Sequence, residues 1–226
     1  RYLDLIMNAE SRDTFIKRSR IISAIRSYLN GQGFLEVETP ILVANAGGAA
    51  ARPFETHFNA LDEDFKLRIS LELYLKRLIV GGLDRVYEIG RVFRNEGVDS
   101  THSPEFTTLE CYEAYADQFV MAERMKEIIQ SCAKAVGTER IETERGTIDL
   151  FGEWKWVGVY PGLSEAVGVE ITPETDASVL REIAEKHEVD IDPKWDAEKL
   201  VIELFGEIVE PTLVNPTFVY DYPPSA

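Results

Sequence analysis

Two segments in which apolar and polar residues alternate, separated by a loop of turn-forming residues, constrain the fold of this chain most. The first runs from Val86 to Arg94 and the second from Phe106 to Ala116, with residues 95–105 between them. A period of two is typical of strands that bury one face, and turn residues between two such segments indicate a hairpin. We therefore predict an antiparallel pair of strands over these residues.

Segments with helical periodicity lie on both sides of this hairpin. Helices are expected over residues 13–30, 68–83, from Asp117 onward, 172–192 and 196–209, and short strands over residues 34–40 and 218–220. This order argues against a doubly wound parallel fold, and the sequence has no glycine-rich phosphate loop of the dinucleotide or Walker type. We predict an α+β fold in which helices flank an antiparallel β-sheet.

The composition is that of an ordinary soluble globular protein, with 45% apolar and 28% charged residues among 226. No apolar run approaches the ~18–20 residues of a membrane span, and no signal-peptide pattern opens the chain. Cys111 and Cys132 lack metal-ligand spacing and are expected to be free thiols in a reducing compartment. We therefore expect a cytoplasmic protein with no membrane partner.

The net charge of −16 limits how this chain can bind nucleic acid. Surfaces that grip phosphates usually cluster Lys and Arg, whereas the basic residues here are outnumbered and scattered. Contact with a polyanion is expected only through a local patch or through a segment outside this chain.

The predicted strands place charged side chains on one face of the sheet. Alternation puts Glu110 and Tyr112 on the same face as Phe106, and it puts Glu88 and Arg94 together on the other strand. If protein covers this face, the charges are costly unless they are paired or bind a ligand. If water covers it, they are ordinary surface groups. Patterning alone leaves both interpretations open.

The loop between the strands favours a binding site. Arg94, Glu96, His102 and Phe106 lie in it or at its ends. An arginine fork suits a phosphate or carboxylate, a histidine adds a second anion contact, and an aromatic ring offers a stacking face for a base. A loop histidine alone is usually solvated, but the four residues together resemble a nucleotide site.

The sequence around this loop resembles motif 2 of the class II aminoacyl-tRNA synthetases. The resemblance rests on Arg-Val-Phe-Arg-Asn-Glu-Gly at 91–97, His-Ser-Pro-Glu-Phe at 102–106 and Glu-Cys-Tyr-Glu-Ala-Tyr-Ala-Asp at 110–117. Gly-Phe-Leu-Glu-Val-Glu-Thr-Pro at 33–40 is similar to motif 1, whose proline, Pro40 here, lies at the dimer interface in that family.

Three further segments resemble the lysyl branch of that family. They are Arg-Tyr-Leu-Asp-Leu at 1–5, Gly-Gly-Ala-Ala-Ala-Arg-Pro-Phe at 47–54 and Glu-Leu-Tyr-Leu-Lys-Arg-Leu at 72–78. The resemblance runs nearly end to end and implies that residues 1–226 are part of a class II catalytic domain. Motif 1 then covers about 14–40, motif 2 about 84–117, and a helical insertion about 172–209.

The resemblance also implies what this polypeptide lacks. In the family, strands with acidic magnesium ligands and then motif 3 follow the point where this chain stops, and an anticodon-binding barrel precedes its start. We therefore expect no metal ligands within this chain, Mg²⁺ ligands in a C-terminal segment beyond it, and no activity of the 226-residue polypeptide by itself.

The family implies four ATP contacts in this sequence. Arg94 grips the α-phosphate and the substrate carboxylate, which makes it the catalytic residue. Glu96 contacts the adenine end, His102 the γ-phosphate, and Phe106 stacks on the adenine. Charge that develops as the carboxylate attacks the phosphate is stabilised by the arginine.

The family also implies a lysine site. Glu72, Glu110 and the backbone of Gly48 receive the α-amino group, Tyr112 helps to hold the ε-ammonium, and Arg94 binds the carboxylate. Without the resemblance, Glu72 is most simply a solvated helix carboxylate. Gly48 with its neighbour Gly47 suits a backbone pressed against a ligand or another segment.

The leading hypothesis is therefore a homodimeric ligase that uses ATP and Mg²⁺ to activate lysine and transfers it to tRNA. A paralogue that transfers lysine to a protein acceptor is one alternative, and a non-catalytic relic kept for dimerisation or regulation is another. Glu72 disfavours an aspartyl or asparaginyl relative, because the Glu-Leu-Tyr-Leu-Lys helix is similar to the lysyl branch.

Overall fold

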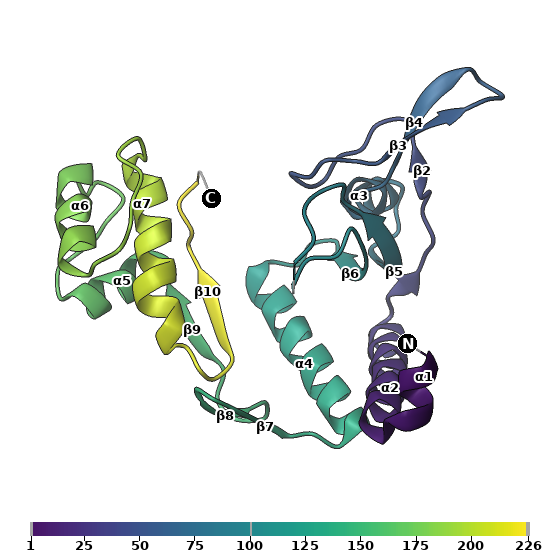
Figure 1. Ribbon diagram of the computed structural model, residues 1–226, viewed down its shortest axis with the longest axis horizontal. Coiled ribbons are helices and arrows are strands. Elements are labelled where there is room, and N and C mark those ends of the chain that lie inside the picture. Colours follow the sequence, from purple (N-terminus) through teal and green to yellow (C-terminus); the bar gives the residue numbers. More distant parts are fainter. Residues whose placement is uncertain (1, 100, 225–226) are drawn as a thin grey trace. The chain divides into compact units, whose positions relative to one another are not determined.

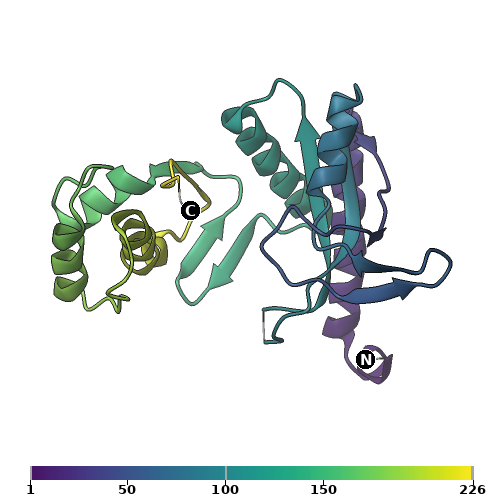
Figure 2. The ribbon, with the colours of Figure 1, turned by 90° about the horizontal axis from the view of Figure 1, so that it is seen from above.

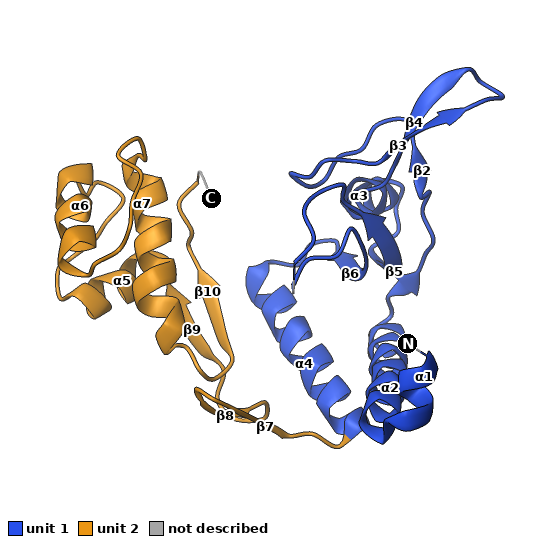
Figure 3. Ribbon diagram, viewed as in Figure 1, with its two compact units in different colours: residues 1–136 blue, residues 137–226 orange. Residues whose placement is uncertain are grey.

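The computed structural model describes residues 2–99 and 101–224 of the chain. Arg1 and Ser100, which belong to motifs named above, lie outside the described residues. The chain forms two compact units, residues 1–136 and residues 137–226, which are described one at a time (Figure 3).

The helices of unit 1 begin at recognisable caps. They are α1 (Tyr2–Met7), α2 (Ala9–Gly31), α3 (Glu72–Val80) and α4 (Gln118–Val136). The Asn8 side chain accepts hydrogen bonds from two amides in the first turn of α2, and the Asp117 side chain does so at α4. The helices predicted over 13–30 and from Asp117 onward are confirmed, whereas the one predicted over 68–83 is shorter.

The predicted hairpin is the centre of unit 1. Its strands are β5 (Arg85–Phe93) and β6 (Glu105–Glu113), which pair antiparallel with Glu88 opposite Glu110. A short strand, β1 (Leu35–Glu36), pairs parallel to β5. The prediction of a strand over 34–40 was too long, because beyond Val37 the Thr39 amide bonds to the Glu88 carboxylate and Pro40 has no amide hydrogen.

A second sheet in unit 1 has the order β2-β4-β3 and is antiparallel throughout. Its strands are β2 (Leu42–Val43), β3 (Glu55–Phe58) and β4 (Glu63–Leu67). The β3–β4 hairpin projects from the unit in both ribbon views (Figures 1 and 2). This sheet connects motif 1 to α3, and the loop that contains Gly47 and Gly48 lies between β2 and β3.

Helices cover both faces of the β5–β6 hairpin. On one face Tyr87 packs in a buried cluster with residues of α2 and α4, namely Leu29 and Ile128. On the other face Val86 and Val92 pack with α3 through buried leucines. The face that contains Glu88 and Tyr112 is therefore the α3 face, and protein covers part of it, which settles the alternatives left open by patterning.

Unit 2 has its own hydrophobic core, between three helices and a small sheet. It contains β7 (Arg140–Thr143), β8 (Gly146–Asp149), β9 (Lys155–Gly158), α5 (Val159–Val167), α6 (Ala177–Lys186), α7 (Ala197–Leu204) and β10 (Thr217–Tyr220). After α7 the chain continues as a π-helical turn, Phe205–Val209, and a 3₁₀ turn, Glu210–Thr212. β7 and β8 pair antiparallel, and β9 pairs parallel to β10.

The α+β prediction is confirmed: small, mainly antiparallel sheets are flanked by helices. The helices predicted over 172–192 and 196–209 are present in shorter form as α6 and α7, each capped by an aspartate side chain. None of the described helices combines the length and apolar character that crossing a membrane requires.

Candidate active site

The candidate site is built on the α3 face of the hairpin, where Glu110 links two elements. Its Oε1 atom accepts hydrogen bonds from the Leu71 amide at 3.0 Å and from the Ser70 hydroxyl at 3.2 Å. Its Oε2 atom accepts one from the Tyr112 hydroxyl at 3.2 Å. The carboxylate on β6 therefore fixes the start of α3, which begins with Glu72.

Tyr112 is held as a neutral hydrogen-bond donor. Burial raises the pKa of its phenol above the usual value, and the nearby carboxylates of Glu110 and Glu72 raise it further. The Tyr112 side chain therefore lies near the carboxylates of Glu110 and Glu72.

A lysine of the chain itself lies at this acidic group. The Lys76 Nζ atom is 2.6 Å from the Glu72 carboxylate and 6.0 Å from the centre of the Tyr112 ring. Lys76 was not among the predicted site residues, although its spacing of one helical turn from Glu72 predicts such a pair. The structure therefore shows an ε-ammonium group accommodated beside Glu72 and Tyr112.

The glycine loop packs directly on the first turn of α3. Gly48 has a φ of +87°, and a Cβ atom there would lie 2.9 Å from Ser70 Oγ and 3.0 Å from Glu72 Cβ. At Gly47, a Cβ atom would lie 2.9 Å from a Leu73 methyl group. The backbone of this loop is therefore pressed closely against the start of the helix that carries Glu72, and its contact with a substrate stays a prediction.

Arg94 follows β5 and is anchored at both its backbone and its side chain. Its amide donates to the Pro104 carbonyl at 2.8 Å across the loop ends. Its Nε atom makes a long, 3.4 Å hydrogen bond to the Ile69 carbonyl, just before α3. The guanidinium carbon lies 5.2 Å from the centre of the Phe106 ring, which is within the range of a cation–π contact between these two residues.

Glu96 connects the motif 2 loop to the glycine loop. Its Oε1 atom accepts a hydrogen bond from the Arg52 amide at 3.2 Å, and the Asn95 amide donates to the Arg52 carbonyl at 2.7 Å. Glu96 itself is exposed. The segment that would touch lysine and the segment that would touch ATP are therefore joined by two hydrogen bonds.

His102 lies in the exposed part of the loop and is paired with Asp99. The imidazole Nδ1 atom is 2.8 Å from Asp99 Oδ2. Hydrogen bonds from the Thr101 amide and from the His102 side chain lower the pKa of Asp99 to about 2. Asp99 was not among the predicted site residues. Only its position three residues before His102 indicates the contact between the two side chains.

A buried ion pair supports the site from beneath. Arg68 and Glu88 are 4% and 3% exposed, and Nη1 of the arginine is 2.7 Å from Oε1 of the glutamate. Thr39 donates its hydroxyl to the other oxygen of Glu88 at 2.6 Å, and Arg68 donates to the Thr39 and Arg91 carbonyls. The pair thus joins the end of motif 1 to β5, the strand that leads to Arg94.

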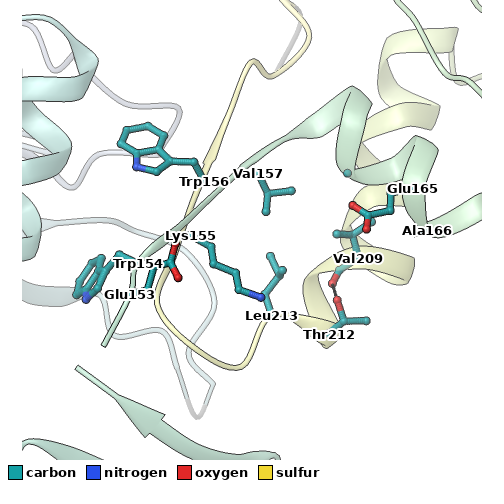
Figure 4. A pocket seen from close by; sticks show the side chains of 11 residues that line it. Glu153, Trp154, Lys155, Trp156, Val157, Glu165, Ala166, Val209, Thr212 and Leu213 are labelled. Atoms are coloured by element: carbon teal, nitrogen blue, oxygen red, sulfur yellow. Dashed lines mark hydrogen bonds between the residues drawn. The ribbon is translucent and has the colours of Figure 1, made fainter. Parts of the chain in front are cut away.

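A pocket of about 780 Å³ lies elsewhere, within unit 2. Figure 4 shows Trp156, Lys155 and Leu213 among the side chains around it. None of the residues predicted to bind ATP or lysine lines this pocket. All the residues predicted to bind ATP or lysine lie in unit 1.

Known proteins resemble the chain over its whole length. Residues 1–226 match the family described as tRNA synthetases class II (D, K and N). The chain is 51% identical to the lysine–tRNA ligase of Enterococcus faecalis over 224 residues, which are 99% of this chain and 45% of that protein.

Two further lysine–tRNA ligases match at a similar level. Those of Bacillus subtilis and Moorella thermoacetica are each 49% identical over 224 residues, 99% of this chain and 45% and 46% of the relatives. The chain thus spans less than half the length of these curated relatives. With both sequence motifs in place and a family match from its first residue to its last, the chain belongs to the class II tRNA synthetases.

Proposed function

We propose that this chain carries the lysine- and ATP-binding part of a lysine–tRNA ligase. The observation that supports this best is the ammonium group of Lys76, which lies against Glu72 and beside Tyr112. A cluster that accepts this ammonium has the negative charge that a substrate ammonium group requires. The names of the relatives point to the same substrate.

In this proposal the acidic cluster binds both ends of lysine. Glu72, Glu110 and the Gly48 backbone receive the α-amino group, and Tyr112 contacts the ε-ammonium. Lys76 is then displaced from Glu72 or shifted aside when the substrate enters. An exposed pair one helical turn apart contributes only about 0.3–0.5 kcal/mol, so this rearrangement costs little.

The ATP end of the site is assigned to the motif 2 residues. Arg94 binds the α-phosphate and the lysine carboxylate, Phe106 stacks on adenine, Glu96 contacts the adenine end, and His102 contacts the γ-phosphate. A carboxylate oxygen attacks the α-phosphorus, the bond to the β-phosphate oxygen breaks, and pyrophosphate leaves. Arg94 holds the two anionic reactants together, and such positioning lowers a barrier by ~7–11 kcal/mol in favourable cases.

The second step transfers lysine to tRNA. A ribose hydroxyl of the tRNA 3′ end attacks the lysyl carbonyl, and AMP leaves with the bonding electrons. With a net charge of −16, this chain offers little to hold the rest of a tRNA. We therefore assign most of the tRNA contact to parts of the protein outside this chain.

Magnesium assists phosphate transfer when it is bound to ATP. Among the described residues, no three His, Cys, Asp or Glu side chains are grouped so that they could hold a metal ion. No step is therefore assigned to Mg²⁺ ligands of this chain.

A homodimer is proposed from the surface around motif 1. Pro40 is exposed, and so are large apolar side chains near it in sequence and on α1: Leu3, Ile6, Met7, Leu35 and Ile41. Exposed apolar side chains that share one side of an element mark association surfaces, and Leu3, Ile6 and Met7 have this helical spacing on α1. The cytoplasm is the proposed location, because Cys111 and Cys132 are free thiols whose pKa is raised by burial.

Amino-acid-dependent exchange of pyrophosphate with ATP tests the proposal. The assay is made on protein with the full length of the relatives that carries this segment, with each standard amino acid in turn. Exchange with lysine and with none of the others is the predicted result. Exchange with aspartate or asparagine would place the chain in another branch of its family, and no exchange with any amino acid would favour a non-catalytic role.

A further inference from the structure

Asp99 gathers a set of hydrogen bonds around His102. Its Oδ1 atom accepts from the Thr101 amide at 2.7 Å, from the Thr101 hydroxyl at 2.9 Å and from the His102 amide at 2.8 Å. Its Oδ2 atom lies 2.8 Å from Nδ1 of the His102 ring. One carboxylate thus holds both the backbone and the ring of the histidine.

Because Nδ1 of His102 faces Asp99, the other ring nitrogen, Nε2, is available to bind a ligand. A carboxylate only accepts hydrogen bonds, so Nδ1 of His102 is the protonated nitrogen that faces Asp99. The His102 side chain is 74% exposed. Nε2 has no hydrogen-bond partner among the residues that the structure describes, and it is the atom through which His102 can meet a ligand.

A phosphate needs a donor at Nε2. An imidazole that already donates from Nδ1 can donate from Nε2 only when both nitrogens are protonated. The ring then bridges two anions, a carboxylate on one side and a phosphate on the other. In such an arrangement the carboxylate orients the ring and compensates its charge, as it does for metal-bound histidines.

We propose that Asp99 is a positioning residue, which holds His102 so that Nε2 donates to a terminal phosphate of ATP. The inference rests on the proposed function for the role of His102. It adds a residue that acts through the histidine and that touches no substrate itself.

The competing explanation is that Asp99 only shapes the turn. Aspartate and asparagine side chains both accept hydrogen bonds from backbone amides two and three residues ahead, as Asp99 does here. The variant Asp99→Asn keeps an acceptor for those amides and loses the negative charge that faces Nδ1. It therefore separates a turn role from a role in orienting a charged ring.

Direct binding of nucleotides, without amino acid or tRNA, is the first experiment. Titration calorimetry compares ATP with AMP for the wild-type protein, Asp99→Asn and a matched control, Glu105→Gln, whose carboxylate faces Arg91 at 3.4 Å. We expect Asp99→Asn to weaken ATP binding about three- to tenfold, because it disturbs one charge-assisted hydrogen bond. AMP binding and the control variant stay within about twofold of wild type, as expected for groups that do not meet the terminal phosphates.

A double-mutant cycle with His102→Ala tests whether Asp99 acts through the histidine. In the His102→Ala background, Asp99→Asn is expected to have no further effect on ATP affinity. Additive losses would overturn the proposal, because Asp99 would then act independently.

Three other results would also overturn it. Unchanged ATP affinity in Asp99→Asn would leave only the turn role, and tighter ATP binding would mean that Asp99 competes with the phosphate. An effect that appears only in the KM for tRNA would move the contact to a tRNA phosphate.

Since the binding test needs no turnover, failure of the proposed lysine activity is recognised separately, from the absence of lysine-dependent exchange in wild type.

Discussion

At the scale of single residues, the proposed function makes Glu72 the carboxylate on which recognition of lysine is expected to depend most. Glu72→Gln keeps the shape and removes the charge that meets an amino group. Because a hydrogen bond to a charged group contributes about 1.5–3 kcal/mol, the KM for lysine is expected to rise roughly tenfold or more. The KM for ATP is expected to stay unchanged. Steady-state pyrophosphate exchange measures both.

Lys76→Met is the informative partner of that variant. It removes the ammonium that lies on Glu72 in the structure and keeps most of the side-chain volume. The KM for lysine is expected to fall or stay within about twofold, because an exposed pair of this kind is weak. A rise of tenfold would show that Lys76 organises the site and would contradict the idea that it stands in for the substrate.

Tyr87, which is buried, and Tyr28, which is partly buried, give a pH prediction. Burial, followed by hydrogen bonds to Glu127 and Glu36, raises the pKa of Tyr28 and of Tyr87 to about 12. Their folded-state pKa thus exceeds the unfolded value of about 10. The stability they contribute is complete below about pH 10 and is lost as the pH rises toward 12. The free energy of unfolding in urea is expected to fall across that range, and less steeply in Tyr87→Phe.

Sequence reasoning found the residues whose chemistry is local and missed those whose role depends on a partner. Strand alternation put Glu110 and Tyr112 on one face, and the family resemblance supplied their expected roles. Arg68 was read only as the start of a helix, because its partner Glu88 is brought to it by sheet pairing and no local pattern reports that contact. Asp99 was missed because its function depends on the loop conformation.

At the scale of elements, the glycine loop depends on its close approach to α3. Gly48→Ala adds a Cβ atom 3.0 Å from Glu72 Cβ, at a φ of +87°. Gly82→Ala is a matched control, since Gly82 has a φ of +93° and open space around it. Both variants are expected to lose about 1–3 kcal/mol of stability through backbone strain. Only Gly48→Ala is expected to raise the KM for lysine, and equal KM values would contradict the proposed contact.

The buried pair beneath the site is expected to be costly to break. Glu88→Gln leaves Arg68 without its ionic partner, and such losses typically amount to about 3–5 kcal/mol. Replacing both, as Arg68→Met with Glu88→Leu, is expected to cost clearly less than the sum of the two single replacements. Urea unfolding of the wild type, Arg68→Met, Glu88→Leu and the double variant measures this coupling. Additive losses would show that the two charges do not depend on each other.

The hairpin and the long helices were predictable, because each element follows from its own periodicity. The third strand of that sheet was predicted over residues 34–40, but its bounds were not predictable, since β1 spans only Leu35–Glu36 and its end depends on the hydrogen bond from Thr39 to Glu88. The helix predicted over 68–83 was too long at its start, because residues 68–71 are not helical and form hydrogen bonds with other segments instead. Periodicity reports which residues face a core, and capping and long-range bonds decide where an element ends.

At the scale of the whole molecule, the structure divides the chain between residues 136 and 137. The assignment of residues 1–226 to one partial catalytic domain, with an insertion at about 172–209, remains a prediction. Local patterns define each unit but contain no information on how two units pack. The prediction that both units belong to one catalytic domain therefore rests on the family resemblance alone.

Dimer formation is the prediction that belongs to this scale. Ile6→Asp puts a charge on the exposed apolar surface of α1, where Ile6 is 66% exposed. It is expected to shift the protein from dimer to monomer in sedimentation velocity, because burying an unpaired charge is costly. Val80→Asp, at an 89% exposed position at the end of α3, is the control and is expected to leave the dimer intact. A monomeric wild-type protein would contradict the proposed dimer.

The central claim is that Arg94, anchored between Pro104, Ile69 and Phe106, brings the lysine carboxylate and the ATP α-phosphate together. Lysine-dependent exchange of pyrophosphate with ATP in Arg94→Ala tests it most directly, with Arg91→Ala as control because Arg91 is an exposed arginine of the same strand that pairs with Glu105. The expected result is loss of at least about a hundredfold in kcat/KM, the typical cost of removing a group that stabilises transition-state charge, with the control near wild type. Exchange that survives in Arg94→Ala while the fold stays intact by circular dichroism would contradict the assignment of the site.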